Sequence, residues 1–410
     1  MTDNIALKRT LSLPMMILYG LGTTIGAGIY ALIGEIAGVA GYFAPISFLV
    51  ASILAGFTAM SFAELCSRFP RAAGAALYVK QGFSSQRLST VVGLLVIIAG
   101  LISAAALVNG FVGYLHQFID IERVTAIVLV TILLGGIAIW GIAESVTIAS
   151  LITVIEIAGL LLVIGVSGEG LSAFSSRWSE LVPTTDINSW TGIYLGAALS
   201  FYAFIGFEDM VDVAEEVKDV KRNLPLAILL TLGITTFIYM LLMVTAVLTL
   251  PPTELANSEA PLAKIYEHYT GEKAIIISII GMFAIINGAL IQMIMGSRVL
   301  YGLSSRGQLP DLLGIVHHRT RTPIIATVVA AAIVLVLALM GSLASLAEAT
   351  SVIMMSIFSI VNLALWRIKR RDSNPVDIII FPIWIPITGF FVSLAFVLSE
   401  VASLIFEIIS

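Results

Sequence analysis

Long apolar stretches recur along almost the whole chain, and they constrain its fold more than any other feature. An α-helix of roughly 20 apolar residues crosses a bilayer core about 30 Å thick, and about eleven stretches of this sequence reach that length. Only 11% of the residues are charged, too few to cover a water-soluble domain of this size. The sequence therefore predicts an all-α polytopic membrane protein. The expected spans are 12–39, 44–67, 88–115, 124–142, 146–167, 191–214, 226–249, 274–303, 323–340, 343–364 and 381–407.

Lysine and arginine gather in alternate loops, which indicates how the chain is oriented. Cytoplasmic loops carry an excess of these residues. If the N-terminus is cytoplasmic, 17 of the 21 basic residues fall on the cytoplasmic side, and only Arg123, Arg177, Lys264 and Lys273 fall outside. We expect a multi-pass protein of the cell (plasma/inner) membrane, with its N-terminus cytoplasmic and, after an odd number of spans, its C-terminus outside. The first apolar run is expected to be retained as a span, because no small-residue cleavage site follows it.

The remaining polar residues indicate neither an enzyme nor a nucleic-acid partner. Membrane topology explains the basic cluster at 367–371. The single cysteine, Cys66, is expected to be a small buried residue, and His317 and His318 have no partner at metal-ligand spacing. We expect no catalytic residue, no metal and no cofactor other than a coupling ion. The lipid bilayer is the expected surrounding, and the oligomeric state is left open.

Two parts of the sequence repeat each other at a fixed distance. Ile25 and Glu35 match Ile205 and Glu215, at an offset of 180 residues in both cases. Five spans separate the copies, and an odd number means that the second unit enters the membrane from the opposite side. This pattern is typical of an inverted-topology repeat. The predicted divisions are 1–170 for the first unit (spans 1–5), 171–372 for the second (spans 6–10) and 373–410 for an extra C-terminal span.

Each half also has one long loop with a short semi-apolar piece in it. These pieces are residues 74–79 after the second span and 261–266 after the seventh. We expect both to lie as helices against the mouth of the membrane domain, on opposite faces.

The first span contains the sequence GTTIGAGIY at 22–30, with three glycines near its centre. Glycine costs about 1 kcal/mol relative to alanine in a helix interior. The glycines are either a small-residue packing face or the place where the helix unwinds. The sixth span favours unwinding, because Gly206 there precedes Glu208 and Asp209, and carboxylates inside a membrane are costly away from a water-filled path.

A pair of breaks in corresponding spans is the best sequence indication of a transporter's binding site. The free N–H groups of a half-helix attract an anionic group, and free carbonyls accept hydrogen bonds from an ammonium or bind a cation. A zwitterion such as an amino acid suits such a site.

Several short motifs occur in order from the first span to the eighth. They are GAGIY at 26–30, AEL at 63–65 with RFPRAAGA at 68–75, FYAFIGFED at 201–209 with AEEVK at 214–218, and SRVLY at 297–301. Together they resemble the amino acid-polyamine-organocation (APC) superfamily of amino acid permeases. The resemblance implies a leucine-transporter-like 5+5 inverted repeat, here with one additional C-terminal helix.

The resemblance also implies secondary active transport of amino acids or related amines by alternating access, and we favour proton coupling. A sodium-coupled symporter or an exchanger of the same fold is the alternative. A membrane sensor that binds amino acids without transporting them is an alternative from another class.

The resemblance further implies a site built largely from backbone groups. The N–H groups of residues 26–28 would bind the substrate carboxylate, and carbonyls of the second break would bind its ammonium. Tyr202 or Phe204 would be an aromatic gate, and Phe207 would shape the side-chain pocket, with ordinary helix packing as the alternative for each ring. The implied substrate-binding residues are Ile25, Gly26, Ala27, Gly28, Tyr202, Phe204, Ile205 and Phe207.

The coupling ion depends on Glu156, near the middle of the fifth span. By resemblance it faces carbonyls near Gly22 and Ile25, which would repel a carboxylate. Glu156 is therefore protonated or shares a cation. We favour a carboxyl that loads and releases the coupling proton. The rivals are a sodium ion held with span-eight oxygens such as Asn287, and a permanently protonated acid hydrogen-bonded inside the bundle.

The other polar residues of the spans receive simpler roles. Of Glu208 and Asp209, one is expected to point into the cavity and the other to cap the half-helix. Asn109 is expected to form an interhelical hydrogen bond. The carboxylates near the membrane faces, expected to be mouth or loop-anchoring charges, are Glu35, Glu64, Glu215 and Glu216.

Overall fold

The computed structural model of the chain describes residues 9–71, 74–140, 146–168, 172–304, 309–372 and 375–409. Every named element within these ranges is a helix, and the only strand-like pairing among them is an isolated bridge between Leu11 and Val217. Eight helical stretches in the described residues are long and apolar enough to cross a membrane, and three apolar helices are shorter. The prediction of an all-α polytopic membrane protein is confirmed.

The long helices begin and end within a few residues of most of the expected spans. The sixth departs most, because α9 ends at Tyr202 and a 3-10 helix, η3, continues the segment. The long helices are α1 (Leu13–Ala40), α2 (Ala44–Arg68), α4 (Gln86–Leu115), α5 (Arg123–Trp140), α6 (Val146–Val166), α9 (Ile187–Tyr202), α10 (Val220–Thr249), α13 (Ile275–Ser304), α14 (Ile324–Met340), α15 (Leu343–Arg371) and α16 (Trp384–Ile409).

Shorter helices lie in the connections. Both semi-apolar loop pieces are helical, as α3 and α12. The short elements are α3 (Gly74–Phe83), α8 (Phe174–Arg177), α11 (Pro252–Ala256) and α12 (Pro261–Thr270), with the 3-10 helices η1 (Gly41–Phe43), η2 (Trp178–Leu181), η3 (Phe207–Glu216) and η4 (Asp311–Gly314).

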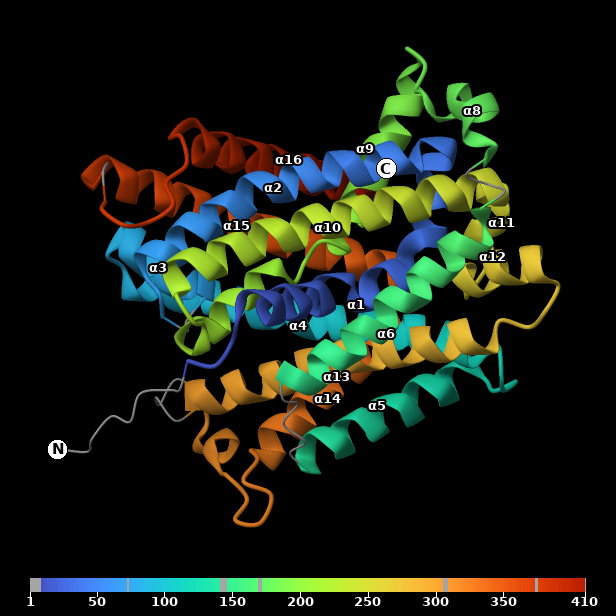
Figure 1. Cartoon of the computed structure of the whole chain (residues 1–410). Helices are drawn as coiled ribbons and strands as arrows, with labels where there is room; N and C mark the ends of the chain where they lie inside the picture. The colour runs from blue at the N-terminus through green and yellow to red at the C-terminus, as the bar shows by residue number, and fades with distance from the viewer. Residues whose placement is uncertain are drawn as a thin grey trace.

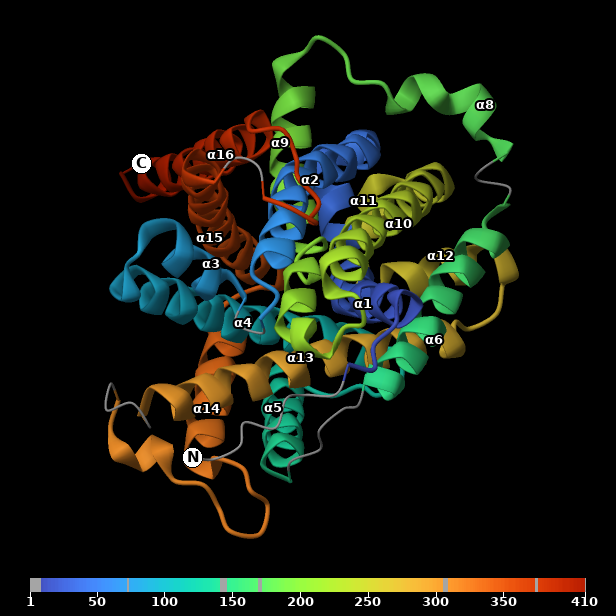
Figure 2. The same cartoon turned by 60° about the vertical axis from the view of Figure 1, so that its left-hand side comes forward.

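Helix α1 lies inside the bundle (Figure 1), where it packs against α6, α9, α10 and α13. Helix α3 and the connection between α13 and α14 lie at one end of the bundle, whereas α8, α11 and α12 lie at the other. Figure 2 shows α5 beside α14 at one edge, and α15 beside α16 at another. The two short loop helices α3 and α12 are therefore at opposite ends, as expected.

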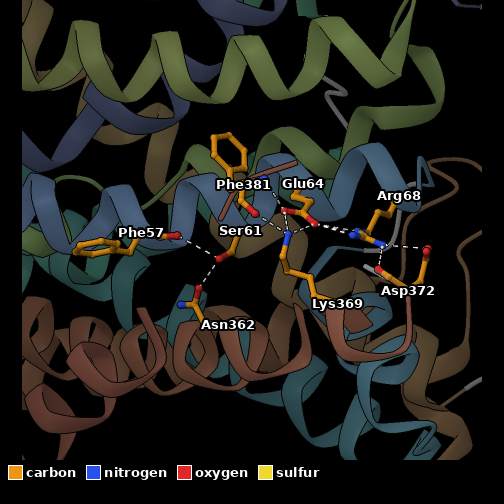
Figure 3. A network of polar contacts seen from close by, with 8 residues as sticks. All are labelled: Phe57, Ser61, Glu64, Arg68, Asn362, Lys369, Asp372 and Phe381. Carbon is orange, nitrogen blue, oxygen red and sulfur yellow. Dashed lines mark hydrogen bonds and ion pairs between the residues drawn. The ribbon is translucent and has the colours of Figure 1, made fainter. Parts of the chain in front are cut away.

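A buried ionic cluster connects α2, α15 and the segment that leads into α16 (Figure 3). The Glu64 side chain is fully buried, and the Lys369 Nζ atom lies 2.7 Å from each of its carboxylate oxygens. Arg68 donates to the same carboxylate from Nη2 at 2.8 Å. The backbone N–H of Phe381 donates to Glu64 at 2.9 Å, and the Phe381 carbonyl accepts from Lys369 at 2.7 Å. Glu64 thus anchors a connecting segment, as the sequence predicted.

Candidate functional site

Both predicted helix breaks are present, and they touch each other. Helix α1 leaves helical geometry at Gly26, where φ is −17° and ψ is −106°. Helix α9 ends at Tyr202, and η3 begins after Gly206, whose φ is +127°. A Cβ atom built on Gly206 would overlap the carbonyl of Thr23. Glycine is required at 206 both by this positive φ and by the close approach of the two broken segments.

Two hydroxyl groups satisfy carbonyls that the breaks release. The Tyr239 hydroxyl of α10 lies 2.9 Å from the Thr24 oxygen and 3.0 Å from the Ala203 oxygen, so it bridges the two broken segments. The Thr23 hydroxyl lies 3.0 Å from the carbonyl of Gly206. Irregular backbone inside a membrane is stable only when its polar groups have such partners.

A cavity of about 80 Å³ lies beside the crossing of the breaks. A Cβ atom built on Gly26 would meet nothing within 4 Å, so this residue faces open space. Residues predicted for both functions line the same cavity. Those from the substrate-binding set are Gly26, Gly28, Tyr202 and Ile205, and those from the coupling set are Gly22, Glu156, Asp209 and Asn287.

Phe204 and Phe207, from the predicted substrate-binding set, do not line this cavity. The Phe204 ring is fully buried and packs edge-on against aromatic rings of α2 and α10. The Phe207 ring is also fully buried and packs against aromatic rings of α2 and α15. Ile25 is buried away from the cavity, and the side chain of Ala27 lies outside the described residues.

A second, larger cavity of about 390 Å³ adjoins the first. It leads toward the end of the bundle where α3 lies, because residues of α3, α4, α13 and α15 line it. The opposite end is closed over α1, since a Cβ atom built on Gly34 would lie 2.6 Å from the carbonyl oxygen of Leu255 in α11. The residues common to both cavities are Ser103, Ile205, Asp209 and Gln292.

The adjacent carboxylates of η3 occupy different surroundings. The Glu208 carboxylate accepts a hydrogen bond from the backbone N–H of Gly206 at 2.9 Å, just before the start of η3. Asp209 lines both cavities. Asp212, one helical turn further on, lines the second cavity together with Glu208.

Glu156 comes from α6 and is 3% exposed. The Tyr30 hydroxyl donates to the backbone carbonyl of Glu156 at 2.7 Å, which holds this turn of α6 against α1. Asn287 reaches the same cavity from α13. Helices α1, α6 and α13 therefore bring the predicted coupling residues Gly22, Glu156 and Asn287 to one cavity.

A family model described as amino acid permease matches residues 10–408 of the chain. The chain belongs to the amino acid permease family. The chain is 28% identical over 394 residues to "Cationic amino acid transporter 2, vacuolar" of Arabidopsis thaliana, with 90% of this chain and 61% of the relative covered. It is 25% identical over 395 residues to "Branched-chain amino acid permease BcaP" of Bacillus subtilis, with 90% and 83% covered.

A transporter of Mycobacterium tuberculosis is 30% identical to the chain over 337 residues, which cover 81% of this chain and 74% of the relative. The chain spans about three fifths of the length of the plant relatives that it matches. The predicted resemblance to APC permeases is confirmed by the family match, and the relatives are named as transporters and permeases.

Some residues that the fold brings to the site were not predicted from the sequence. Tyr239 and Thr23 bridge the breaks, and Ser103 and Gln292 lie where the cavities meet. A polar residue inside a span carries no signal of the helix that it will face. Asp212 did carry a signal, because it follows Asp209 by three residues within the sixth expected span.

Asn109 forms hydrogen bonds between helices and does not line the cavities given above. Its side-chain amide donates to the carbonyl of Ala338 in α14 at 3.0 Å, and its side-chain oxygen accepts from Arg123 at 2.9 Å. The interhelical role predicted for Asn109 is therefore confirmed. Cys66 is fully buried, as expected.

Proposed function

We propose that this permease carries an amino acid across the cell membrane by alternating access, with the cavity beside Gly26 as the substrate site. The observation that carries this proposal is a cavity at the crossing of two helix breaks that continues toward the end of the bundle where α3 lies, whereas α11 packs closely on α1 toward the other end. A carrier open to one side and closed to the other has this form. The names of the relatives support an amino acid substrate, and they include both cationic and branched-chain classes.

The fold of the proposed carrier is a 5+5 inverted repeat with an extra eleventh span. The units are 1–170 and 171–372, and the extra span lies in 373–410. Three features support this arrangement: matching breaks near Gly26 and Gly206, short helices at opposite ends after the second and seventh spans, and long helices near each expected span. With this arrangement the N-terminus is cytoplasmic and the second cavity opens to the cytoplasm.

The proposed substrate contacts are mostly backbone groups. The N–H groups at residues 26–28 bind the carboxylate, and carbonyls between Tyr202 and Ile205 bind the ammonium. Tyr202 suits the aromatic gate better than Phe204, because Tyr202 lines the cavity and its hydroxyl is 2.8 Å from the Ser103 hydroxyl. Phe207 packs against aromatic rings of α2 and α15 and so stabilises the segment that follows the break.

Glu156 is the proposed carrier of the coupling proton. It is buried, it lines the substrate cavity, and it lies on a helix that packs against the broken α1. Burial in a low-dielectric site favours the neutral acid, and a path to water allows the acid to release its proton. A sodium ion between Glu156 and Asn287 is the second candidate, because both side chains line the same cavity.

Uptake into proteoliposomes tests the proposed function. The purified full chain is reconstituted and offered a panel of labelled amino acids and amines under a pH gradient or a sodium gradient. We expect saturable uptake of at least one amino acid, stimulated by the pH gradient. Folded protein that transports none of them contradicts the proposal, and saturable binding without uptake supports a sensor.

A further inference from the structure

Several carboxylates line the two connected cavities. Glu156, Glu208, Asp209 and Asp212 are among the lining residues. In the described part of the chain, no lysine, arginine or histidine lines either cavity. Carboxylates in such surroundings require protons or a cation that enters from solution.

Two of these carboxylates already have other roles. Glu208 accepts a hydrogen bond from the backbone N–H of Gly206 at the break. Glu156 lies on α6, apart from the others, and it is the proposed proton carrier. Asp209 and Asp212 are left as the carboxylates that face the cavities without an assigned role.

The local helix type places Asp209 and Asp212 on one face. Both lie in η3, a 3-10 helix, and residues three apart are eclipsed in that geometry because it has three residues per turn. Consistently, both line the second cavity, and Asp209 also reaches the first. Phe207 and Met210, on another face of η3, are fully buried. The two carboxylates therefore follow the path from the first cavity toward the second.

The first cavity contains a further polar atom that indicates a ligand. The Thr24 hydroxyl lies beside the α1 break, the residue is 2% exposed, and this hydroxyl has no hydrogen-bond partner among the described residues. A buried hydroxyl without a partner is costly. A ligand that spans the cavities would meet Thr24 and the α1 backbone at one end, Ser103, Gln292 and Asp209 where the cavities join, and Asp212 in the second cavity.

We infer that the transported amino acid has a cationic side chain, an ammonium or a guanidinium, that binds Asp209 and Asp212. This inference rests on the proposed function, because it needs the zwitterionic part of the substrate at the helix breaks. A guanidinium or ammonium forms charge-assisted hydrogen bonds with carboxylates. An aliphatic side chain would offer neither aspartate a charged partner, and Asp209, which is partly buried, would lose the most. Asp209 is then a substrate ligand, and Glu156 alone carries the proton.

Binding and uptake of arginine, lysine and leucine by the full chain test the inference. We expect arginine or lysine to bind and enter, with leucine at least about tenfold weaker, since one lost charged contact at a buried site costs that much or more. Asp209→Asn is expected to weaken arginine or lysine binding by at least about tenfold. Asp212→Asn, at an exposed position, is expected to act in the same direction and tests the subsite even where Asp209→Asn fails to fold. Asp311→Asn, an exposed carboxylate of η4 outside both cavities, is the matched control and is expected to bind as the unaltered chain does.

The outcomes separate this inference from the proposed function. Uptake of leucine without arginine or lysine overturns the cationic subsite and leaves amino acid transport standing. Equal weakening of leucine and lysine binding in Asp209→Asn also overturns the subsite, because a side-chain ligand must discriminate between them. Folded protein that takes up no amino acid overturns both.

Discussion

Lys369 and Glu64 form a buried ion pair between α15 and α2, with Nζ 2.7 Å from both carboxylate oxygens. Their side chains are 5% and 0% exposed. The pair lies near the ends of both helices and also holds the backbone of Phe381. A single cluster thus fixes two spans and the entry to α16, so its loss affects three segments together.

Lys369→Met is expected to lower the free energy of unfolding by about 3 kcal/mol, because removing one partner leaves the other charge buried. Arg68 remains bonded to Glu64 and limits the loss. Thermal unfolding of the purified chain measures the change. Arg370→Met, on the next and exposed residue of α15, is the control and is expected to change stability little. Equal stability of the two variants would show that the ion pair does not hold the helices together.

The two central glycines are expected to respond differently to alanine. In Gly206→Ala, alanine must adopt a positive φ and its Cβ atom overlaps the Thr23 carbonyl. We therefore expect the free energy of unfolding to fall by about 2 kcal/mol or more. Gly26→Ala adds a methyl group to open space in the cavity, so we expect folded protein with weakened substrate binding. Thermal unfolding and equilibrium substrate binding, measured on both variants, distinguish these effects. Normal substrate binding by the Gly26→Ala variant would show that the substrate binds elsewhere.

Much of the helix layout could be predicted from the sequence, because a lipid-facing helix must be apolar over a fixed length. The boundaries of α2, expected at 44–67 and found at Ala44–Arg68, are an example. The breaks were also predictable, because Glu208 and Asp209, close to Gly206, are costly inside an unbroken span. The length of a span and the presence of a break each depend on the sequence of one segment, so each can be predicted from that segment alone.

The directions in which side chains point were not predictable. Phe204 and Tyr202 lie two residues apart, yet only Tyr202 lines the first cavity. Which of them does so depends on how the end of α9 and the turn after it are oriented against their neighbours. That orientation cannot be predicted from the sequence of one segment. For the same reason the sequence did not predict the role of Tyr239, whose hydroxyl joins two breaks that lie far from it in sequence.

Tyr239→Phe is expected to destabilise the site by about 1–3 kcal/mol, because the Thr24 and Ala203 carbonyls lose a shared buried donor. Substrate binding is expected to weaken with it, since these carbonyls belong to the two breaks. Tyr266→Phe, on α12 and outside both cavities, removes a hydroxyl of the same kind as a control. The two variants are compared by thermal unfolding with and without substrate. If Tyr239→Phe matches Tyr266→Phe in both measurements, the bridge does not support the site.

Glu156→Gln is expected to keep substrate binding and to lose the response of uptake to a pH gradient. The amide has nearly the shape of the protonated acid but cannot release a proton. In the unaltered chain, uptake into proteoliposomes should rise when the outside is made more acidic than the inside, because Glu156 loads a proton outside and releases it inside. In Glu156→Gln, uptake at equal external substrate should be the same with and without that gradient. Exchange of labelled for unlabelled substrate, which needs no net proton movement, should persist and shows that the variant is folded. Undiminished uptake that is still driven by the pH gradient would remove Glu156 from the coupling step, and uptake driven by sodium alone would support the site between Glu156 and Asn287.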